Sequence, residues 1–536
     1  MMKIDPINTP ETFLAFISLL SVFVLSACKE KPPLVVAIDP KIGSMGDIVS
    51  IAGENFGGEQ GTSYVTIAGQ EPTSSSYLEW SNTLIRVRLP EFGGAGLIYV
   101  HRGGRKSNPV LFSDRGNIPQ SSQTAHRVGP VIDEIRPSSA PIGSLISIRG
   151  NGFGTNAENG KVFFTWSAEN STQITMEAMN SGLGDEKWTS EEIRVHIPDG
   201  AISGNIEVHT SRGKSLPVYF EVTGKPGFKT FKDKRSYTVS YSVNIKVQAA
   251  SAPNTLYVWV PEPTRSASQP NIQLLSRNNN PIAENYRGTS LFQLKDVVSG
   301  ANININLSYV VDAYGVETNI NLSDVSSQNS MPDTFLQETP LLPVDKIQRL
   351  AETIVGRERN PYVKAKRIYD WILDAVAVQA EPLYNEVENV VEQKKADAYS
   401  ASLLFCTLAR GAGIPALPIA GVLVDRFRET SPHYWAEFWI EGLGWVPVDM
   451  GLGAGLAPKD FSVPQDARAW YFGNIDSQRI AFSRGQNPLS PMDPRGRRAI
   501  RNPDYALQDF WEEAVGDIQS YSSLWSGIAV TGAYAQ

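Results

Sequence analysis

Residues 394–449 carry the pattern that most restricts how this chain can fold, because helix and strand signals follow each other there without interruption. The first part is apolar over residues 399–412 and is followed by Gly413 and Pro415. Glycine commonly ends helices and proline cannot continue them, so we expect a buried helix over 399–412. The run 416–424 is almost entirely apolar and predicts a buried strand.

Two further strands are expected after this run, over residues 433–440 and 445–448, joined by a glycine-containing turn. The first strand begins with the imidazole of His433, and the second is followed at once by the carboxylate of Asp449. In an antiparallel pair these two groups can lie side by side across the ladder. A carboxylate in that position would hold the histidine ring and fix its tautomer.

The residue pattern of this stretch resembles the core of the transglutaminase-like superfamily, a papain-type fold with a Cys-His-Asp site. The resemblance rests on a helix end R-x-x-G-I-P-A that starts at Arg410, a strand motif H-x-W-x-E that starts at His433, and a motif G-x-G-W-x-P-x-D that ends at Asp449. His433 and Asp449 are sixteen residues apart, as is usual in that family. The resemblance implies an α+β papain-like domain with His433 as the catalytic base and Asp449 as its orienting acid.

The same resemblance places the family's nucleophile twelve residues before Arg410, where this chain has Ala398. The glycine that the family has two residues before the nucleophile is replaced by Ala396. Covalent catalysis of this type needs a thiolate at the helix N-terminus, where the helix dipole and a protonated histidine lower its pKa. Because alanine has no nucleophilic atom, we expect a degenerate site that keeps the base and its orienting acid but lacks the attacking group.

Three other side chains of the same predicted helix are candidate nucleophiles. Cys406 lies about 12 Å further along the helix axis, from a rise of ~1.5 Å per residue, within an apolar run that predicts a buried core thiol. Ser400 faces nearly the opposite side of the helix, whereas Ser402 shares the face of Ala398 but lies roughly 6 Å further along the axis. An unexpected nucleophile on this helix stays an alternative to an inactive site.

The N-terminus predicts a lipoprotein signal peptide over residues 1–28. An apolar run over 13–25 is too short to span a bilayer comfortably, and small residues precede Cys28. This arrangement resembles a bacterial lipobox, which implies cleavage before Cys28 and acylation of its thiol and new amino group. The alternatives are a signal peptide cut elsewhere and a buried N-terminal helix. We expect a protein that is lipid-anchored in the bacterial cell envelope, at the outer membrane or the periplasmic face.

Residues 34–222 contain an internal repeat. A block that starts at Pro40 returns at Pro137 with an offset of 97 residues, and a later block that starts at Trp80 returns at Trp188 with an offset of 108. Alternating apolar residues, glycine-rich turns and a repeat length of about 90 residues are typical of small β-sandwiches. The order of the motifs resembles IPT/TIG immunoglobulin-like domains, which implies spacers or binding modules.

These patterns predict a multidomain chain in which two Ig-like sandwiches come before an α+β core. We place the IPT/TIG domains at 34–114 and 129–223. Alternating strands predict a third β-sandwich over 229–325, which resembles the one that often precedes transglutaminase-like cores. The transglutaminase-like domain is expected over 340–485, and the remaining residues, 486–536, form a C-terminal extension.

Three helices are expected outside the central stretch. Residues 344–355 carry an apolar stripe at helical spacing, and Asn360 followed by Pro361 marks the start of the next helix. Near the end of the chain, residues 508–521 are expected to form a short helix within an otherwise weakly structured tail.

Composition narrows the class of partner. The net charge of −8 and the scattered basic residues argue against nucleic acid. Two cysteines cannot form a disulfide framework. Four of the five histidines lie in the repeat without metal-ligand spacing, so we expect neither a metal nor another cofactor.

Three functions fit these features. We favour an envelope-anchored, non-catalytic transglutaminase-like protein that binds a peptide, a protein or a peptidoglycan fragment. The first alternative is an active cysteine-protease-like or acyl-transfer enzyme that uses an unexpected nucleophile, or uses His433 and Asp449 as a general base. The second alternative is a structural or adhesive surface protein whose IPT/TIG domains do the binding.

Overall fold

The computed structural model describes residues 31–535 apart from short gaps at 92–94, 116–128, 156–159, 170–173, 179–185, 225 and 503. The chain forms two compact units, Met1–His126 and Arg127–Gln536. The predicted signal peptide and Cys28 lie outside the described residues. Within those ranges, no helix combines the length and the apolar character needed to cross a membrane.

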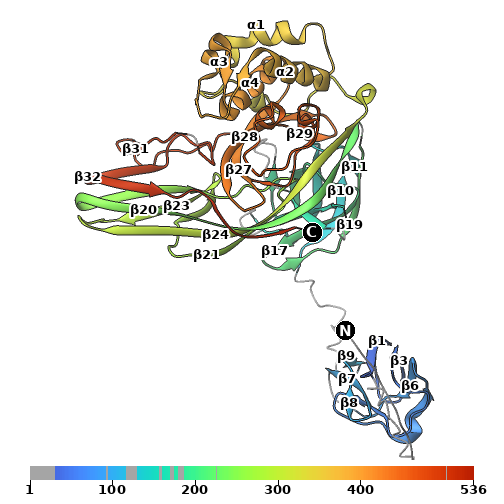
Figure 1. The fold of residues 1–536 in the computed structure, drawn as a ribbon. Helices are drawn as coiled ribbons and strands as arrows, with labels where there is room; N and C mark the ends of the chain where they lie inside the picture. The colour runs from blue at the N-terminus through green and yellow to red at the C-terminus, as the bar shows by residue number, and fades with distance from the viewer. Residues whose placement is uncertain are drawn as a thin grey trace, which may run out of the picture. The chain divides into compact units, whose positions relative to one another are not determined.

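The first unit is a β-sandwich (Figure 1). One sheet has the strand order β1-β3-β6-β5 and the other has the order β2-β9-β7-β4, with β8 paired to β7. The strands are β1 (Leu34–Asp39), β2 (Ile42–Gly43), β3 (Ile48–Glu54), β4 (Tyr64–Ile67), β5 (Tyr77–Trp80), β6 (Leu84–Arg88), β7 (Ala95–Arg102), β8 (Arg105–Lys106) and β9 (Val110–Asp114). Successive side chains of a strand point to opposite faces, so Val49 and Ile51 on β3 both enter the core.

The second unit begins with a sandwich of the same design. Its sheets have the orders β10-β12-β16-β15 and β11-β19-β17-β13-β14, with β18 paired to β17. The strands are β10 (Val131–Arg136), β11 (Ser139–Ala140), β12 (Leu145–Asn151), β13 (Lys161–Trp166), β14 (Ile174–Glu177), β15 (Lys187–Trp188), β16 (Glu192–His196), β17 (Gly204–Thr210), β18 (Gly213–Lys214) and β19 (Val218–Val222).

The repeated tryptophan makes the same contact in both sandwiches. The indole N–H of Trp80 donates to the carbonyl oxygen of Phe56 at 3.0 Å, and that of Trp188 donates to the carbonyl oxygen of Phe153 at 3.0 Å. The sequence repeat therefore corresponds to a repeated structural unit in which this tryptophan fixes the F-G turn.

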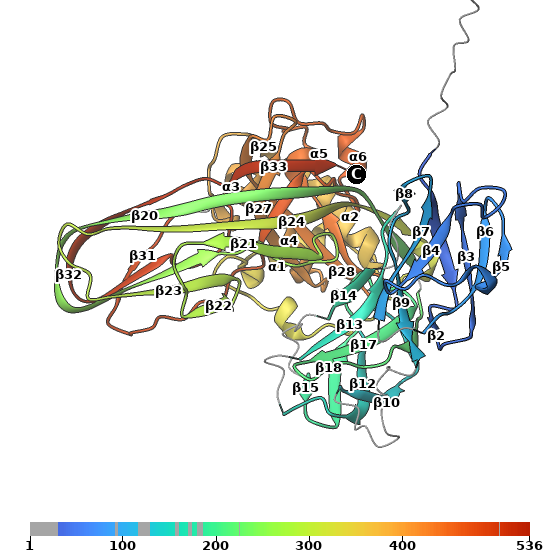
Figure 2. The same cartoon turned by 90° about the horizontal axis from the view of Figure 1, so that it is seen from below.

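A long antiparallel sheet follows, with the order β21-β24-β20-β23-β22. Its strands are β20 (Gly227–Pro261), β21 (Asn271–Arg277), β22 (Ala283–Tyr286), β23 (Thr289–Lys295) and β24 (Asn302–Ile320). In Figure 2, β20 and β24 extend side by side as an elongated arm, joined there by β32 from the C-terminal tail. The predicted fold class, two Ig-like sandwiches and a third β-domain ahead of an α+β core, is confirmed.

The predicted helix over 508–521 is wrong. The tail instead forms β32 (Glu512–Trp525) and β33 (Ala529–Ala535), which both pair with β20, and a short β31 (Arg497–Ala499) pairs with β32. Ala514 and Ile518 are buried and four residues apart, a spacing that satisfies both a helix and a strand. The pairing partner, far away in sequence, decides between the two.

The α+β core packs helices against a four-stranded sheet with the order β29-β28-β27-β30 (Figure 1). Its longer elements are α1 (Val344–Val355), α2 (Pro361–Ala375), α3 (Val387–Gln393), α4 (Ala398–Gly411), β27 (Ala416–Val424), β28 (Thr430–Ile440), β29 (Gly444–Val448) and β30 (Arg479–Arg484), with short pieces β25 (Ala377–Val378), β26 (Lys395–Ala396), α5 (Met450–Gly453) and α6 (Ala467–Trp470). The predicted helices at 344–355, after Asn360 and over 399–412 are confirmed, as are the three predicted strands. The Asn360 side chain caps α2 by accepting hydrogen bonds from the N–H groups of Tyr362 and Val363.

The second sandwich is packed tightly onto the core sheet within the second unit. Ile142 and Ile197 of the sandwich share one apolar cluster with Trp439 and Trp445 of the core. Beside this cluster the buried ammonium group of Lys229 pairs with the carboxylate of Asp199 and also donates to the carbonyl oxygen of Trp445 at 2.7 Å. The packing makes this sandwich a fixed wall of the core rather than a loosely attached module.

Replacing Gly143 with alanine tests this packing. The equivalent glycine of the first sandwich is Gly46, and both have a positive φ, 86° and 90°. An alanine in such a backbone conformation costs roughly 1–2 kcal/mol at either position. At Gly143 the added Cβ would also lie 2.5 Å from the ring of Trp439, whereas at Gly46 nothing lies within 4 Å. We expect hydrogen exchange to show a larger loss of protection in the second unit of Gly143→Ala than in the first unit of Gly46→Ala, and equal losses would contradict the contact.

Candidate functional site

The start of α4 is held in place by its capping residue, Asp397. One carboxylate oxygen accepts hydrogen bonds from the N–H of Ser400 at 2.8 Å and from its hydroxyl at 2.5 Å. The other accepts from the N–H groups of Leu383 and Tyr384 at 2.8 and 3.0 Å. These bonds satisfy one of the free N–H groups of the first turn and tie it to the preceding loop. Ala398 is the first residue of the helix and is half-buried.

His433 and Asp449 lie together across the sheet. His433 is on β28, and Asp449 directly follows β29, the antiparallel partner of β28. The Nε2 atom of His433 is 2.8 Å from Oδ2 of Asp449, and the second carboxylate oxygen accepts from the N–H of Leu452 at 2.9 Å. The imidazole side chain is only 7% exposed, and the carboxylate is fully buried. The carboxylate can therefore orient the ring, as the hairpin geometry indicated.

Ala398 and His433 approach the same point from two sides. A Cβ atom built on Gly451 would lie 3.1 Å from the Cβ of Ala398 and 3.1 Å from Cε1 of the His433 ring. The methyl group of Ala398 and the Cε1 edge of the His433 ring therefore both border the space above Gly451. The structure brings together the three residues that the sequence pattern selected, and a side chain at position 451 would crowd both Ala398 and His433.

Arg479 on β30 is a further charged member of the site. Its guanidinium group donates to Oδ2 of Asp449 at 3.0 Å and to Oδ2 of Asp476 at 2.6 Å, and it lies over the ring of Trp435 at 4.9 Å. The arginine side chain is 4% exposed. Asp449 thus shares one oxygen between an imidazole and a guanidinium group.

This charge environment controls the ionisation of Asp449. Burial is the largest influence and would raise the pKa of the carboxyl group, but the interaction with the His433 ring, its hydrogen bond and Arg479 outweigh burial and lower the pKa to about 2. A carboxylate with so low a pKa is ionised throughout the physiological range, and it can stabilise positive charge on the imidazole ring.

The Asp449→Asn variant is expected to flatten the acid dependence of stability. The pKa of an unfolded aspartate is about 3.9, so the lower folded value contributes stability that is fully present above about pH 4 and is lost as the pH falls through 2. The full contribution of this pKa difference to the free energy of unfolding is roughly 2 kcal/mol. Urea unfolding should therefore show that the free energy of unfolding falls more between pH 5 and pH 2.5 in the wild type than in Asp449→Asn. Equal decreases in the two proteins would contradict the lowered pKa of Asp449.

The other candidate nucleophiles on α4 are engaged or enclosed. The hydroxyl of Ser400 donates to Asp397, and that of Ser402 donates to the carbonyl oxygen of Ala398 at 2.7 Å. Cys406 is fully buried, and burial raises the pKa of its thiol well above the ordinary value. None of these three side chains is recorded within hydrogen-bonding distance of His433 among the described residues.

Arg479, Asp476 and Gly451 were not selected from the sequence. Residues 480–482 are apolar, but nothing in the local sequence indicates that the arginine before them reaches Asp449. An arginine at the start of a buried apolar strand was the available signal, because a buried charge needs a partner. A second ion pair of low exposure joins Arg484 of β30 to Glu437 of β28 in the same sheet.

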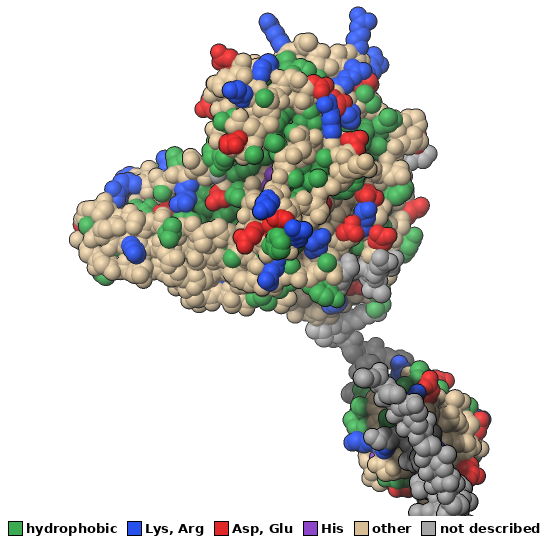
Figure 3. All heavy atoms as spheres, in the orientation of Figure 1, with side chains coloured by type: hydrophobic (Ala, Val, Ile, Leu, Met, Phe, Trp, Pro, Cys, Tyr) green, Lys and Arg blue, Asp and Glu red, His purple; other side chains and the backbone are tan. Residues whose placement is uncertain are grey.

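Charged groups on the surface of the second unit are mixed in sign. Lysines and arginines lie among aspartates and glutamates over the face shown in Figure 3. Several form exposed ion pairs, such as Arg468 with Asp374 at 2.7 Å. Such pairs contribute little to stability.

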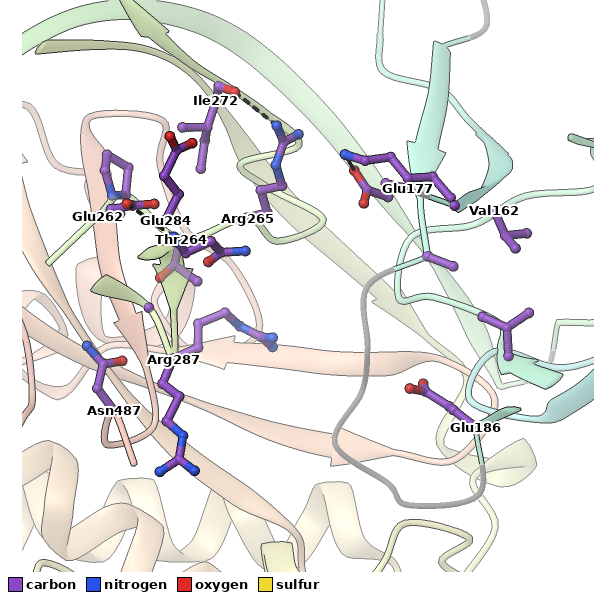
Figure 4. A pocket seen from close by; sticks show the side chains of 18 of the residues that line it. Val162, Glu177, Glu186, Glu262, Thr264, Arg265, Ile272, Glu284, Arg287 and Asn487 are labelled. Carbon is purple, nitrogen blue, oxygen red and sulfur yellow. Dashed lines mark hydrogen bonds and ion pairs between the residues drawn. The ribbon is translucent and has the colours of Figure 1, made fainter. Parts of the chain in front are cut away.

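The second unit also contains a cleft of about 930 Å³ that none of Ala398, His433 and Asp449 lines. Its walls come from the second sandwich and from the long antiparallel sheet, and Arg484 and residues 486–488 also line it. In Figure 4, Asn487 lies on the same side of the cleft as Arg287.

Comparison with known proteins gives the class of protein that this fold and site define. Residues 348–450 match the family model of the transglutaminase-like superfamily, and residues 33–113 and 130–222 each match that of the IPT/TIG domain. The chain therefore carries a transglutaminase-like superfamily core behind two IPT/TIG domains.

Individual relatives match parts of the chain. An uncharacterized protein of Haemophilus influenzae is 27% identical over 185 residues, covering 28% of this chain and 50% of the relative. A cyclomaltodextrin glucanotransferase of a Bacillus species is 36% identical over 62 residues, covering 12% of this chain and 8% of that enzyme. A solved structure described as a candidate cysteine protease of Cytophaga hutchinsonii is 16% identical, with 57% of this chain and 92% of that one covered and a TM-score of 0.37. The chain thus spans half the length of the Haemophilus relative.

Proposed function

We propose that this protein is a catalytically silent transglutaminase-like protein, anchored in the bacterial cell envelope through Cys28, that binds a peptide, a protein or a peptidoglycan fragment. The observation that supports the silent site is the methyl group of Ala398 beside the ring of His433, where the family's nucleophile is expected. A base without a nucleophile cannot form an acyl-enzyme.

The energetics of such sites support the same proposal. The members of a nucleophile-base-acid set act as a unit, so removal of the nucleophile alone removes nearly the whole catalytic effect. Ser402 is the hydroxyl on the helix face of Ala398, and its proton is committed to a backbone carbonyl oxygen. What remains is a rigid, buried imidazole-carboxylate-guanidinium network in a folded domain.

The anchoring part of the proposal is supported by the lipobox-like pattern that ends at Cys28. An acylated cysteine with more than one chain gives stable membrane attachment without a membrane-spanning helix. The remaining chain would then face the envelope as a tethered binding protein.

The test is turnover. The purified protein is offered a panel of glutamine donors with amine acceptors and a panel of peptides, and ammonia release and peptide cleavage are measured beside the His433→Ala variant. The expected result is the same background rate for both proteins. Turnover that is present in the wild type and lost in His433→Ala would show an active enzyme and overturn the proposal.

A further inference from the structure

The cleft of about 930 Å³ differs in composition from the buried site at His433. In Figure 4, Glu262, Arg265 and Arg287 lie on one side of the cleft, and Val162, Glu177 and Glu186 lie on the opposite side. The first group belongs to the long sheet and its loops, and the second belongs to the second IPT/TIG domain. The cleft is therefore open to a ligand as large as a peptide, whereas the imidazole of His433 is almost completely enclosed.

Strand edges meet at this cleft. In the long sheet β21 pairs with β24 and β22 pairs with β23, and neither has a second partner among the described strands. Both contribute lining residues, Ile272 from β21 and Asn285 from β22. The free edges of β21 and β22 therefore border the same cleft. On the opposite wall, Glu177 comes from β14, the outer strand of its sheet as described. An outer strand carries backbone N–H and C=O groups that can pair with an added extended chain.

The charge of the lining favours an acidic ligand. Six lysines or arginines and four glutamates line the cleft. Four of these six cations already pair with carboxylates, namely Lys161 with Glu177, Lys187 and Arg194 with Glu192, and Arg484 with Glu437. The cations that matter for a ligand are therefore Arg265 and Arg287. Among the described residues, the hydrogen bonds of Arg265 go to the carbonyl oxygens of Pro270 and Ile272, and those of Arg287 go to Pro488 and Ser490. Both guanidinium groups thus bind uncharged acceptors, and a ligand carboxylate would give them the charged partner that guanidinium groups prefer.

We infer that this cleft binds an extended acidic peptide segment, which adds to a strand edge through its backbone and places its carboxylates against Arg265 and Arg287 of the sheet wall. The inference rests on the proposed function, because it names the ligand and the place of binding for a protein that binds rather than catalyses. Strand edges favour a peptide over a carboxylated sugar polymer, which has no backbone N–H groups to pair with them.

Fluorescence anisotropy with the purified full chain tests the inference. The probe is a fluorescein-labelled decapeptide of alternating glutamate and threonine. A peptide of alternating glutamate and proline has the same charge but lacks half of the backbone donors, and one of alternating lysine and threonine reverses the charge. The glutamate–threonine peptide should bind at least about tenfold more tightly than either, since the first control loses backbone hydrogen bonds and the second loses the charge-assisted hydrogen bonds to the arginines.

Variants locate the site. Arg194→Glu removes an ion-pair partner of Glu192 and adds a carboxylate to the IPT/TIG wall, where it would repel an acidic ligand. Arg287→Ala removes an exposed guanidinium group from the sheet wall. Each should raise the Kd of the glutamate–threonine peptide at least about tenfold. Arg357→Ala, an exposed residue outside the cleft, and His433→Ala should leave the Kd unchanged.

The outcomes separate this inference from the silent site. No binding of the glutamate–threonine peptide, equal binding of the glutamate–proline peptide, equal binding of decagalacturonate, or binding that survives both arginine variants would each overturn the peptide site. None of these results bears on turnover. Turnover lost in His433→Ala would overturn the silent site and leave the peptide measurement as it stands.

Discussion

The Ala398→Cys variant is expected to contain a thiol that a thiol-directed alkylator modifies at least about a hundredfold faster than Cys406, with the fast reaction persisting at pH 6. The new side chain would stand at the first residue of α4, a helix of fourteen residues, and beside the ring of His433. The helix dipole and a protonated imidazole both stabilise a thiolate, and such cysteines have pKa values of roughly 3.5–7.5.

The comparison thiol is already present in the protein. Cys406 lies on the same helix but is fully buried, and burial raises the pKa of its thiol, so the reactive thiolate is scarce there and access is blocked. The experiment is done in a Cys28→Ser background so that only the two cysteines on the helix can be alkylated. Peptide mass spectrometry after timed alkylation then gives both rates in one sample.

A second substitution makes the test specific for the histidine. In Ala398→Cys with His433→Ala, the helix dipole remains but the imidazole does not. The alkylation rate at pH 6 should fall at least about tenfold, because a charged partner close to a cysteine is worth a pKa unit or more. If cysteines 398 and 406 react alike in the single variant, the assignment of Ala398 to the nucleophile position is wrong.

Much of the core was predictable because its signals are local. Gly413 has a φ of 78° directly after α4, a conformation that glycine adopts without cost, so the helix end could be placed from the residue type. The strands β28 and β29 are joined by a short turn with positive φ at Gly442 and Gly444. Once the turn fixes the pairing, the neighbourhood of His433 and Asp449 follows from the register alone.

The features that escaped prediction depend on contacts between distant segments. The tail strand β32 pairs with β20, more than 250 residues earlier, and its apolar spacing fits helix and strand equally. No local signal shows which strand lies beside β30, and only the pairing of β30 with β27 brings the guanidinium group of Arg479 to Asp449. The packing of the second IPT/TIG domain on Trp439 likewise has no local signal.

Replacing Arg479 with leucine is expected to lower the free energy of unfolding by about 3–5 kcal/mol, the usual cost of removing one partner from a buried ion pair. The guanidinium group connects Asp449, which is fully buried, with Asp476, and its own side chain is 4% exposed. Without it, Asp449 keeps only His433 and the N–H of Leu452, and Asp476 keeps the hydroxyl of Tyr471 and the N–H of Gln478. Leucine replaces much of the apolar contact with Trp435, but both carboxylates lose their guanidinium partner.

A matched control separates burial from charge. Arg468 also bridges two carboxylates, Asp370 and Asp374, but it is 43% exposed. Arg468→Leu should cost less than about 1 kcal/mol, because exposed pairs are screened by water and salt. Urea unfolding at pH 7 compares the two variants. If Arg479→Leu costs no more than Arg468→Leu, the buried guanidinium group does not hold Asp449 in place. The orientation of the His433 ring would then depend on the β28–β29 hairpin alone.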